Sequence, residues 1–420
     1  MPAATPTSLL LSRRFLPLFV TQMLGAVNDN LFKNALGVMA LFLSTRYGAG
    51  LVAVGLGVFI APYVLFSSVA GELADRTDKA RLIRFTKLWE LGLMLLGAAG
   101  FLAANLPLLM AVLFGLGVQA TFFSPLKYGI LPDHLPESAL VAGNGAIEAG
   151  TFVGILAGTI AGSALILFPE GPPVVAALGV TLAAAGYAAS RAIPPTKIAA
   201  PNLRVSLALV PRTLALLRTA QARREVWFSA LGISWFWAVG AVVLSELPVA
   251  AKMLLGAGGG VITLFLAVFT VGVGAGSIGC ARLLHGDVSP RLVPHAALGI
   301  AAFTFGLGVF LHNAGTMASP SAVLSAWRGR AILGDLFALA ASGGIFSVSL
   351  YALIQDIAPP AERSRMIAAN NVLNAAAMVA ASAAAAGFAF LGMSPPSILL
   401  ATGAGNLFVS LAILRALPFR

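Results

Sequence analysis

Residues 15–43 read FLPLFVTQMLGAVNDNLFKNALGVMALFL, and this stretch decides the fold of the chain. It is long and apolar enough to cross a bilayer, which takes about 20 residues in a helix. A polar cluster nevertheless stands at its centre, made of Asn28, Asp29, Asn30, Lys33 and Asn34. An ionisable side chain at the bilayer centre costs about 2.5–3.5 kcal/mol on insertion scales. The stretch therefore predicts a membrane helix whose polar side chains face partners or a hydrated pathway.

The composition extends this interpretation to the whole chain. The 420 residues are 59% hydrophobic and 10% charged, whereas a soluble domain carries about 25% charged residues. The mean hydropathy is +0.94. We expect an all-α integral membrane protein with twelve transmembrane helices, at 15–43, 51–70, 86–104, 106–124, 140–167, 173–191, 227–248, 259–282, 292–311, 333–354, 367–391 and 395–415.

The positions of Lys and Arg predict the orientation in the membrane. Nearly all of them lie in alternate loops, and only Arg46, Lys252, Arg328 and Arg330 fall on the other side. Cytoplasmic loops carry the excess of Lys and Arg, so both termini are expected in the cytoplasm. The formal net charge of +11 thus reflects membrane topology, and we expect no nucleic-acid partner.

The chain contains an internal repeat. Ser124, Tyr128 and Asp133 match Ser347, Tyr351 and Asp356 at one offset, and after a three-residue insertion Asn144 matches Asn370 while Glu148 falls on Asn374. Repeats of this kind build many transporters. We expect two pseudo-symmetric six-helix halves, at residues 1–191 and 227–420. The basic segment 192–226 is expected to form a cytoplasmic linker, as in a major facilitator transporter.

The segment after the second span resembles the signature of the major facilitator superfamily. Residues 71–84 read GELADRTDKARLIR and are expected to form a loop. The matching residues are Gly71, Asp75, Arg76, Lys79 and Arg81, with Leu73, whereas Asp78 stands where the family has Gly. The hypothesis is a polar latch that is made in one state and broken in the other. The alternative is a merely solvated charged loop.

Longer strings are similar to the bacterial lysophospholipid transporter family. They are QMLGAVNDNLFKNAL at 22–36, SPLKYGILPDHLP at 124–136 and LVAGNGAIEAGTFVGILAG at 140–158. They look closest to the form fused to an acyl-carrier-protein synthetase and an acyltransferase. The resemblance implies inward flipping of lysophospholipids across the bacterial inner membrane, with membrane lipids around the chain and reacylation inside the cell.

No enzyme is expected in this chain. The fused acyltransferase needs a His four residues before an Asp, and none of His134, His285, His295 and His312 has that neighbour. The acyltransferase and acyl-carrier-protein synthetase are therefore expected to be a separate protein. His and Cys never cluster at metal-ligand spacing, so neither a metal nor another cofactor is expected.

Helical geometry predicts a substrate pathway along residues 15–43. At 100° per residue, Gln22, Asp29 and Lys33 fall within about 40° of each other. Asn30 and Asn34 lie about 100° to one side and Asn28 about 100° to the other. Asp29 and Lys33 are spaced i,i+4 and can pair. This face is expected to contact a zwitterionic headgroup; the alternative is a structural ion pair between helices.

Further candidates lie on other spans. Those for substrate binding are Asn144, Glu148, Asn370, Asn374, Trp235 and Trp237, and those for gating, besides the signature, are Lys127, Asp133 and Asp356. Glu148 is the candidate for a headgroup amine, or else a structural partner of Lys127 or Arg76. Aromatic residues also form interfacial belts, which is the alternative for the tryptophans.

The patterns thus predict a membrane transporter, and the resemblance implies that it moves lysophospholipids by alternating access. The nearest alternative is a proton-coupled exporter of drugs or other amphiphiles, which an apolar cavity also suits. A membrane-embedded lipid enzyme would need a catalytic set that we do not find. A scaffold without transport would tolerate loss of the Asp29 carboxylate.

Overall fold

The computed structural model describes residues 6–43 and 48–416. Eleven of the helices in this part of the chain are long and apolar enough to span a membrane. Helix α2 (Leu16–Leu43) is a twelfth long helix; it carries the polar cluster and is not among these eleven. The expected all-helical membrane bundle is confirmed. The predicted spans agree with the long helices, although several helices extend beyond them at one or both ends.

The long helices fall into two sets that follow each other in the chain. The first group consists of α2, α3 (Gly48–Arg76), α4 (Lys79–Leu102), α5 (Leu106–Gly129), α7 (Leu140–Leu165) and α8 (Gly171–Ser190). The second group consists of α10 (Arg224–Met253), α11 (Gly259–Leu283), α12 (Val293–His312), α14 (Trp327–Ile357), α15 (Arg363–Phe390) and α16 (Pro395–Ala416). Short helix α1 (Pro6–Leu10) precedes them. Other short helices lie between them, namely α6 (Leu131–His134), η1 (Glu137–Ala139), α9 (Leu209–Gln221), η2 (Pro290–Leu292) and α13 (Pro320–Ser325).

The expected loop over residues 71–84 is wrong, because this segment is almost entirely helical. Helix α3 continues to Arg76, and only Thr77 and Asp78 separate it from α4. The Asp78 carboxylate accepts a hydrogen bond from the backbone N–H of Ala80 at 3.0 Å and so caps the next helix. The charged residues therefore remain helical, and the break between α3 and α4 is a two-residue turn whose Asp78 carboxylate caps α4.

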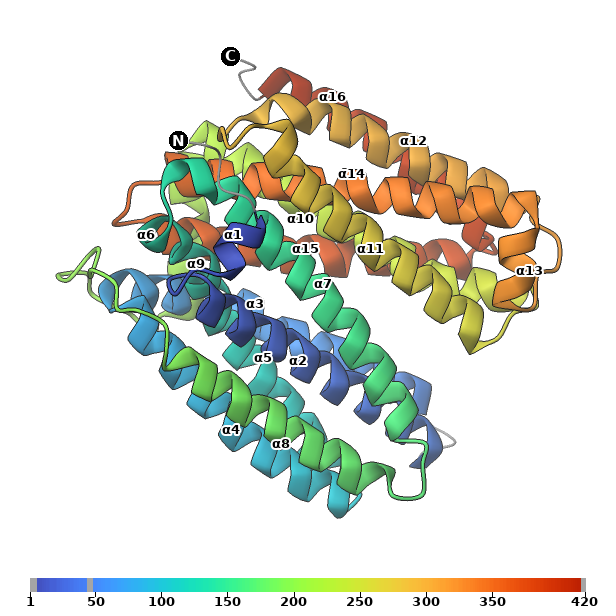
Figure 1. Ribbon diagram of the computed structural model, residues 1–420, viewed down its shortest axis with the longest axis horizontal. Helices are drawn as coiled ribbons and strands as arrows, with labels where there is room; N and C mark the ends of the chain where they lie inside the picture. The colour runs from blue at the N-terminus through green and yellow to red at the C-terminus, as the bar shows by residue number, and fades with distance from the viewer. Residues whose placement is uncertain (1–5, 44–47, 417–420) are drawn as a thin grey trace.

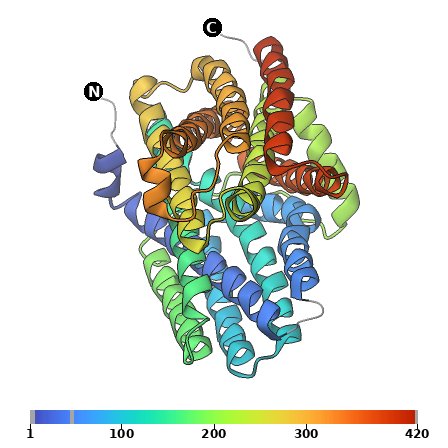
Figure 2. The ribbon, with the colours of Figure 1, turned by 90° about the vertical axis from the view of Figure 1, so that its right-hand side faces the viewer.

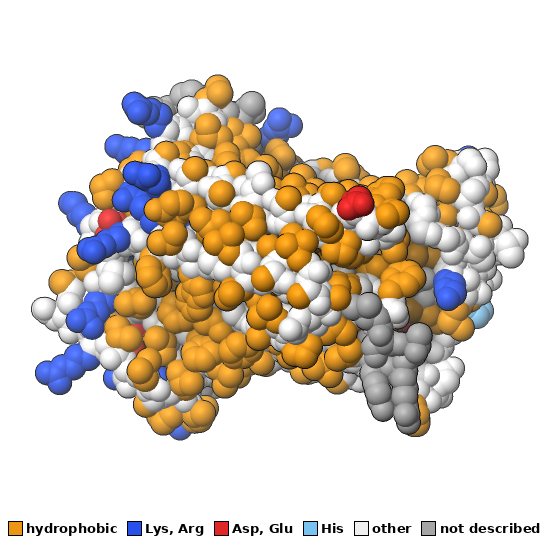
Figure 3. Space-filling view, turned by 90° about the horizontal axis from the view of Figure 1, so that it is seen from below, with side chains coloured by type: hydrophobic (Ala, Val, Ile, Leu, Met, Phe, Trp, Pro, Cys, Tyr) orange, Lys and Arg blue, Asp and Glu red, His pale blue; other side chains and the backbone are white. Residues whose placement is uncertain are grey.

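The two groups lie side by side and diverge from one end of the molecule to the other (Figures 1 and 2). Lys and Arg gather at the end where α6 and α9 lie, whereas side chains along the middle are mostly hydrophobic (Figure 3). We call this the basic end; α3 ends here at Arg76, α4 begins here beside Arg81, α9 contains Arg212, and Arg365 pairs with Asp75 of α3. The opposite end is called the far end. Arg46, expected on the far side, lies outside the described residues.

Two close helix crossings join the groups. A Cβ on Gly71 of α3 would lie 2.7 Å from the Cβ of Ala368 on α15. A Cβ on Gly145 of α7 would lie 2.3 Å from the carbonyl oxygen of Ser277 on α11. Both distances are below van der Waals contact, so only glycine permits these approaches.

Candidate functional site

A cavity of about 320 Å³ lies between the two groups. Helices α2, α3, α4 and α5 supply most of its lining, including all of its charged side chains. The second group contributes mainly aromatic, amide and apolar side chains, namely Trp237, Tyr351, Asn371, Asn374, Ala375 and Met378. The cavity is therefore charged on one wall and nearly neutral on the other.

Helix α2 presents the polar face that its sequence predicts. Gln22, Asp29, Asn30 and Lys33 all line the cavity. Asn34 borders an adjoining cavity instead. Asn28 points away from both, as its angular position requires, and is fully buried. The candidate substrate residue Asn28 therefore does not line the cavity.

The expected pair between Asp29 and Lys33 is not formed: no ion pair joins them within 4.0 Å. The ammonium of Lys33 lies 4.4 Å from the ring centre of Phe59. The Oδ1 atom of Asp29 is buried and has no hydrogen-bond partner among the described residues. The i,i+4 spacing allows a pair, but the neighbouring aromatic ring draws the ammonium elsewhere. The cavity wall thus carries a carboxylate and an ammonium that do not pair with each other.

Two more lysines reach the same cavity, in different states. Lys127 has its ammonium 4.7 Å from the ring centre of Tyr128, and no carboxylate lies within ion-pair distance of it in residues 6–43 and 48–416. Lys87 instead forms an ion pair with Glu90 at 2.6 Å, and both side chains are almost fully buried. Lys127 is therefore a free cation of the cavity wall, whereas Lys87 is neutralised.

Sequence reasoning missed the buried network around Glu90. Its carboxylate accepts hydrogen bonds from the side-chain amides of Asn28 and Gln119, both at 3.1 Å, besides the ion pair with Lys87. The network satisfies an otherwise costly buried charge. Two ionisable residues within the apolar stretch 86–104, three positions apart, were the signal that could have revealed it.

The cavity ends toward the basic end at two stacked tyrosines from the internal repeat. The rings of Tyr128 and Tyr351 lie 4.1 Å apart and nearly parallel, at 7°. Behind them, the Tyr128 hydroxyl donates to Glu148 at 3.1 Å, and Asn370 donates to the Tyr351 hydroxyl at 3.3 Å. The tyrosines thus shield both Glu148 and Asn370 from the cavity.

Asn144 also lies outside the cavity. Its side chain exchanges hydrogen bonds with Gln355 of the second group at 2.6 and 3.1 Å. Gln355 donates in addition to the backbone carbonyl of Tyr128. Asn144 therefore joins the two groups in this state and does not face a ligand.

Only one of the two candidate tryptophans faces the cavity. Trp237 lines it and stacks on Phe152 with ring centres 6.0 Å apart. The indole N–H of Trp235 donates to Asn406 on α16, away from the cavity. The two residues are about 200° apart around helix α10, so they cannot share a face. Asn374 does line the cavity and accepts a hydrogen bond from Ser234 at 2.8 Å.

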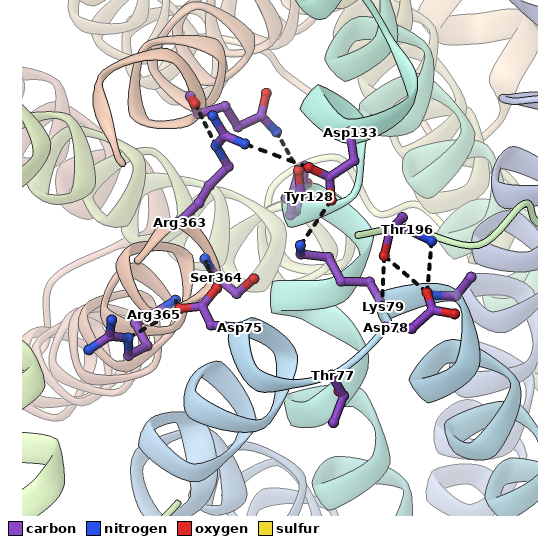
Figure 4. A network of polar contacts seen from close by, with 12 residues as sticks. Asp75, Thr77, Asp78, Lys79, Tyr128, Asp133, Thr196, Arg363, Ser364 and Arg365 are labelled. Atoms are coloured by element: carbon purple, nitrogen blue, oxygen red, sulfur yellow. Dashed lines mark hydrogen bonds and ion pairs between the residues drawn. The ribbon is translucent and has the colours of Figure 1, made fainter. Parts of the chain in front are cut away.

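The signature residue Asp75 joins the groups at the basic end (Figure 4). Its carboxylate is fully buried and accepts hydrogen bonds from the backbone N–H groups of Ser364 and Arg365, at 2.9 and 3.3 Å. It also pairs with the Arg365 guanidinium at 3.1 Å. A carboxylate at a helix N-terminus stabilises the unpaired N–H groups and the positive end of the dipole. Asp75 therefore caps α15 of the opposite group.

A second ionic contact lies beside it (Figure 4). Lys79 pairs with Asp133 at 2.9 Å within the first group, and Arg363 of the second group approaches the same carboxylate at 3.8 Å. Arg76, Arg81 and Asp356 are exposed side chains. Of the gating candidates, the structure thus brings Gly71, Asp75, Lys79 and Asp133 to the closed basic end and Lys127 to the cavity.

In the described part of the chain, two groups of membrane helices enclose a charged cavity, and the hydrogen bonds between them lie toward the basic end. This arrangement is typical of a membrane transporter. A model of the Major Facilitator Superfamily matches residues 18–382, so the chain belongs to this superfamily.

Within the superfamily, the chain resembles curated lysophospholipid transporters. It is 30% identical over 357 residues to the lysophospholipid transporter LplT of Cronobacter sakazakii, covering 84% of this chain and 82% of that one. It is 31% identical over 342 residues to LplT of Escherichia coli, covering 80% and 79%. These relatives are transporters and not enzymes.

Solved structures share the fold at low sequence identity. A bacterial homologue of the iron transporter ferroportin, in an outward-facing state, matches with a TM-score of 0.71 and 15% identity, over 96% of this chain and 99% of that one. The transporter FucP in its outward conformation matches with 0.73 and 15%, over 96% and 98%. At this identity the likeness shows the fold alone.

Proposed function

We propose that this protein flips lysophospholipids from the outer to the inner leaflet of a bacterial inner membrane by alternating access. The basic end faces the cytoplasm, in line with the positive-inside rule, and both termini lie there. The moving bodies are residues 1–191 and 227–420, connected by 192–226. A separate acyltransferase consumes the flipped lipid.

The charged cavity supports a phospholipid headgroup as the cargo. Asp29 offers a buried carboxylate oxygen without a partner, which suits a headgroup ammonium. Lys33 and Lys127 rest on aromatic rings and are free to turn toward a phosphate. These unpaired opposite charges are the observation that carries the proposal, together with the lysophospholipid transport for which the relatives are named.

The contacts at the basic end act as the gate. In this state the cavity is sealed from the cytoplasm by the Tyr128–Tyr351 stack and by Asp75 on the N-terminus of α15. Breaking these contacts while the far end closes would expose the headgroup to the cytoplasm. Asp75, Lys79 and Asp133 serve this step, whereas Arg76, Arg81 and Asp356, which are exposed, interact with lipid headgroups.

The test is a flipping assay in proteoliposomes with fluorescent lysophosphatidylethanolamine. We expect Asp29→Asn to lower the flipping rate roughly tenfold to a hundredfold, since it removes a charge-assisted hydrogen bond. Asp287→Asn, which changes an exposed carboxylate outside the cavity, is the matched control. Equal rates for the two variants would contradict the headgroup role.

The same preparation separates the alternatives. Activity that only moves amphiphiles outward against a proton gradient would favour an exporter. Conversion of lysolipid to diacyl lipid by the purified protein and an acyl donor would favour an enzyme. Neither result is expected.

A further inference from the structure

A second cavity adjoins the charged one and differs from it in chemistry. It has a volume of about 340 Å³ and lies among α2, α3 and α5 of the first group. The two cavities share Asn30, Lys33 and Leu56, so they meet at these residues. No function described above uses this second space.

The lining changes from polar to apolar along α2. Beyond Asn34 every residue that borders the second cavity is apolar or glycine: Leu36, Gly37, Val38, Ala40, Leu41, Leu51, Gly55, Leu56, Leu106, Met110 and Leu113. Leu41 and Leu56 are 50% and 59% exposed, so apolar surface is left uncovered by protein. The apolar lining of the cavity suits a hydrocarbon ligand.

We propose that this second cavity binds the single acyl chain of the lysophospholipid while the headgroup occupies the charged cavity. The inference rests on the proposed function and deepens it. The proposal rests on Lys33, which lines both cavities. A lipid whose headgroup lies at Asp29 would have its glycerol beside Lys33 and its acyl chain directed toward Leu36 and Leu41. The helix rises about 10 Å over the seven residues from Asp29 to Leu36. This rise is the distance along α2 between the proposed headgroup site and the start of the proposed acyl-chain site.

This placement fixes the orientation of the bound lipid. The residues Leu36–Leu41, Leu51–Leu56 and Leu106–Leu113 all belong to the far-end parts of their helices, whereas Asp29 lies near the middle of α2. The tail therefore points to the far end and the headgroup to the basic end. A lipid of the outer leaflet has the reverse orientation. The lipid is thus turned over when it loads, and the later movement of the helix groups only releases it.

The acyl chain also stays with one moving body. All residues of the second cavity belong to α2, α3 and α5 of the first group. An acyl chain lying between the two groups would instead lose its contacts with α15 or α11 when the groups move apart. A lipid with two chains would need a second apolar space of this kind, so the cavity favours lysophospholipids over diacyl lipids.

The experiment is photolabelling with lysophosphatidylethanolamine that carries a diazirine near the end of its acyl chain, followed by peptide mapping. The full-length protein in lipid nanodiscs is used. We expect labels that excess unlabelled lysolipid displaces, on peptides containing residues 36–41, 51–56 and 106–113. Labels on α11 or α15 instead would overturn the inference and leave the proposed function intact. No displaceable label anywhere would overturn both.

Two glycines on one helix give a matched pair of variants. Gly55 faces the second cavity, and a Cβ there would lie 3.4 Å from Leu113. Gly57 is exposed, borders neither cavity, and has nothing within 4 Å of such a Cβ. We expect Gly55→Trp to lower displaceable labelling at least tenfold and Gly57→Trp to leave it unchanged. Met110→Trp fills the same space from α5 and is the substitute if Gly55→Trp does not fold. Unchanged labelling in either variant, once it is shown to fold, would contradict the assignment of the acyl chain to the second cavity.

Discussion

At the scale of single residues, the charges near the cavity divide into satisfied and unsatisfied ones. Lys87 is bound to Glu90, which Asn28 and Gln119 also hold. Asp29, by contrast, keeps a buried oxygen without a partner among the described residues. Because polar groups in a bilayer are costly unless they are paired, a satisfied set points to stability, whereas an unpaired oxygen on a residue that lines the cavity points to a ligand.

This division predicts opposite behaviour for two lysines of the same cavity. Lys87→Met should lower stability by about 3–5 kcal/mol, because it leaves Glu90 as a buried charge without its cation. Lys127→Met should leave stability nearly unchanged and reduce transport, because Lys127 has no such partner. Thermal unfolding in detergent and the flipping assay measure the two effects.

The double variant Lys87→Met/Glu90→Gln is the control for that comparison. It removes both charges together, so most of the lost stability should return. If Lys127→Met proved as destabilising as Lys87→Met, the assignment of Lys127 to ligand binding would be wrong.

At the scale of helices, the contact of α3 with α15 is the main polar junction between the two groups. Asp75 accepts from the first N–H groups of α15, and Gly71 one turn earlier lets the two backbones approach. A carboxylate at a helix N-terminus contributes up to about 2 kcal/mol in partly buried geometry. The junction therefore favours the state with the basic end closed.

Asp75→Asn should shift the protein toward the state with the basic end open, by up to about thirtyfold in population. The physical reason is that the neutral amide interacts less favourably with the helix dipole and with Arg365. Spin labels on cysteines at Arg81 and Asp356, both exposed and on opposite groups, measure the change in distance distribution. The natural Cys280 is buried, which keeps it from the label.

Gly71→Ala tests the steric part of the same junction. The added methyl group would meet Ala368 and the Cα of Arg365 at 2.7 and 2.9 Å, and backbone atoms cannot yield as side chains do. We expect loss of the closed distance population and slower flipping. Gly92→Ala on α4, which has nothing within 4 Å of the added atom, should behave as wild type.

At the scale of the whole molecule, all hydrogen bonds and ion pairs between the two groups of long helices in the described chain lie on the side of the cavity toward the basic end. Ser124 to Asn371, Asn144 to Gln355, and Asp75 to α15 are the principal ones. The structure is thus closed at the basic end, and transport requires these contacts to separate.

A disulfide across this junction should stop transport reversibly. The side-chain oxygens of Ser124 and Asn371 lie 3.0 Å apart, so cysteines at both positions are expected to meet. Oxidation of the double variant should abolish flipping and a reductant should restore it. Each single cysteine variant serves as the control, and full flipping by the oxidised double variant would refute alternating access through this end.

The sequence alone determined the membrane class, the helix order and the polar face of α2. These features depend on local hydropathy and on 3.6-residue periodicity, which a single segment contains. It also located the positions of the repeat, including the two tyrosines that stack in the structure. The superfamily signature identified Gly71 and Asp75, although the segment proved to be helical.

Only the tertiary structure decided which polar residues face the cavity and which are used up by one another. Asn144 is bound by Gln355, and Tyr128 covers Glu148 and bonds one of its two carboxylate oxygens; these contacts join different helices, so no local pattern reveals them. The apolar second cavity likewise requires three helices to meet. Hydropathy describes what a segment tolerates, whereas a partner or a space exists only once distant segments have packed together.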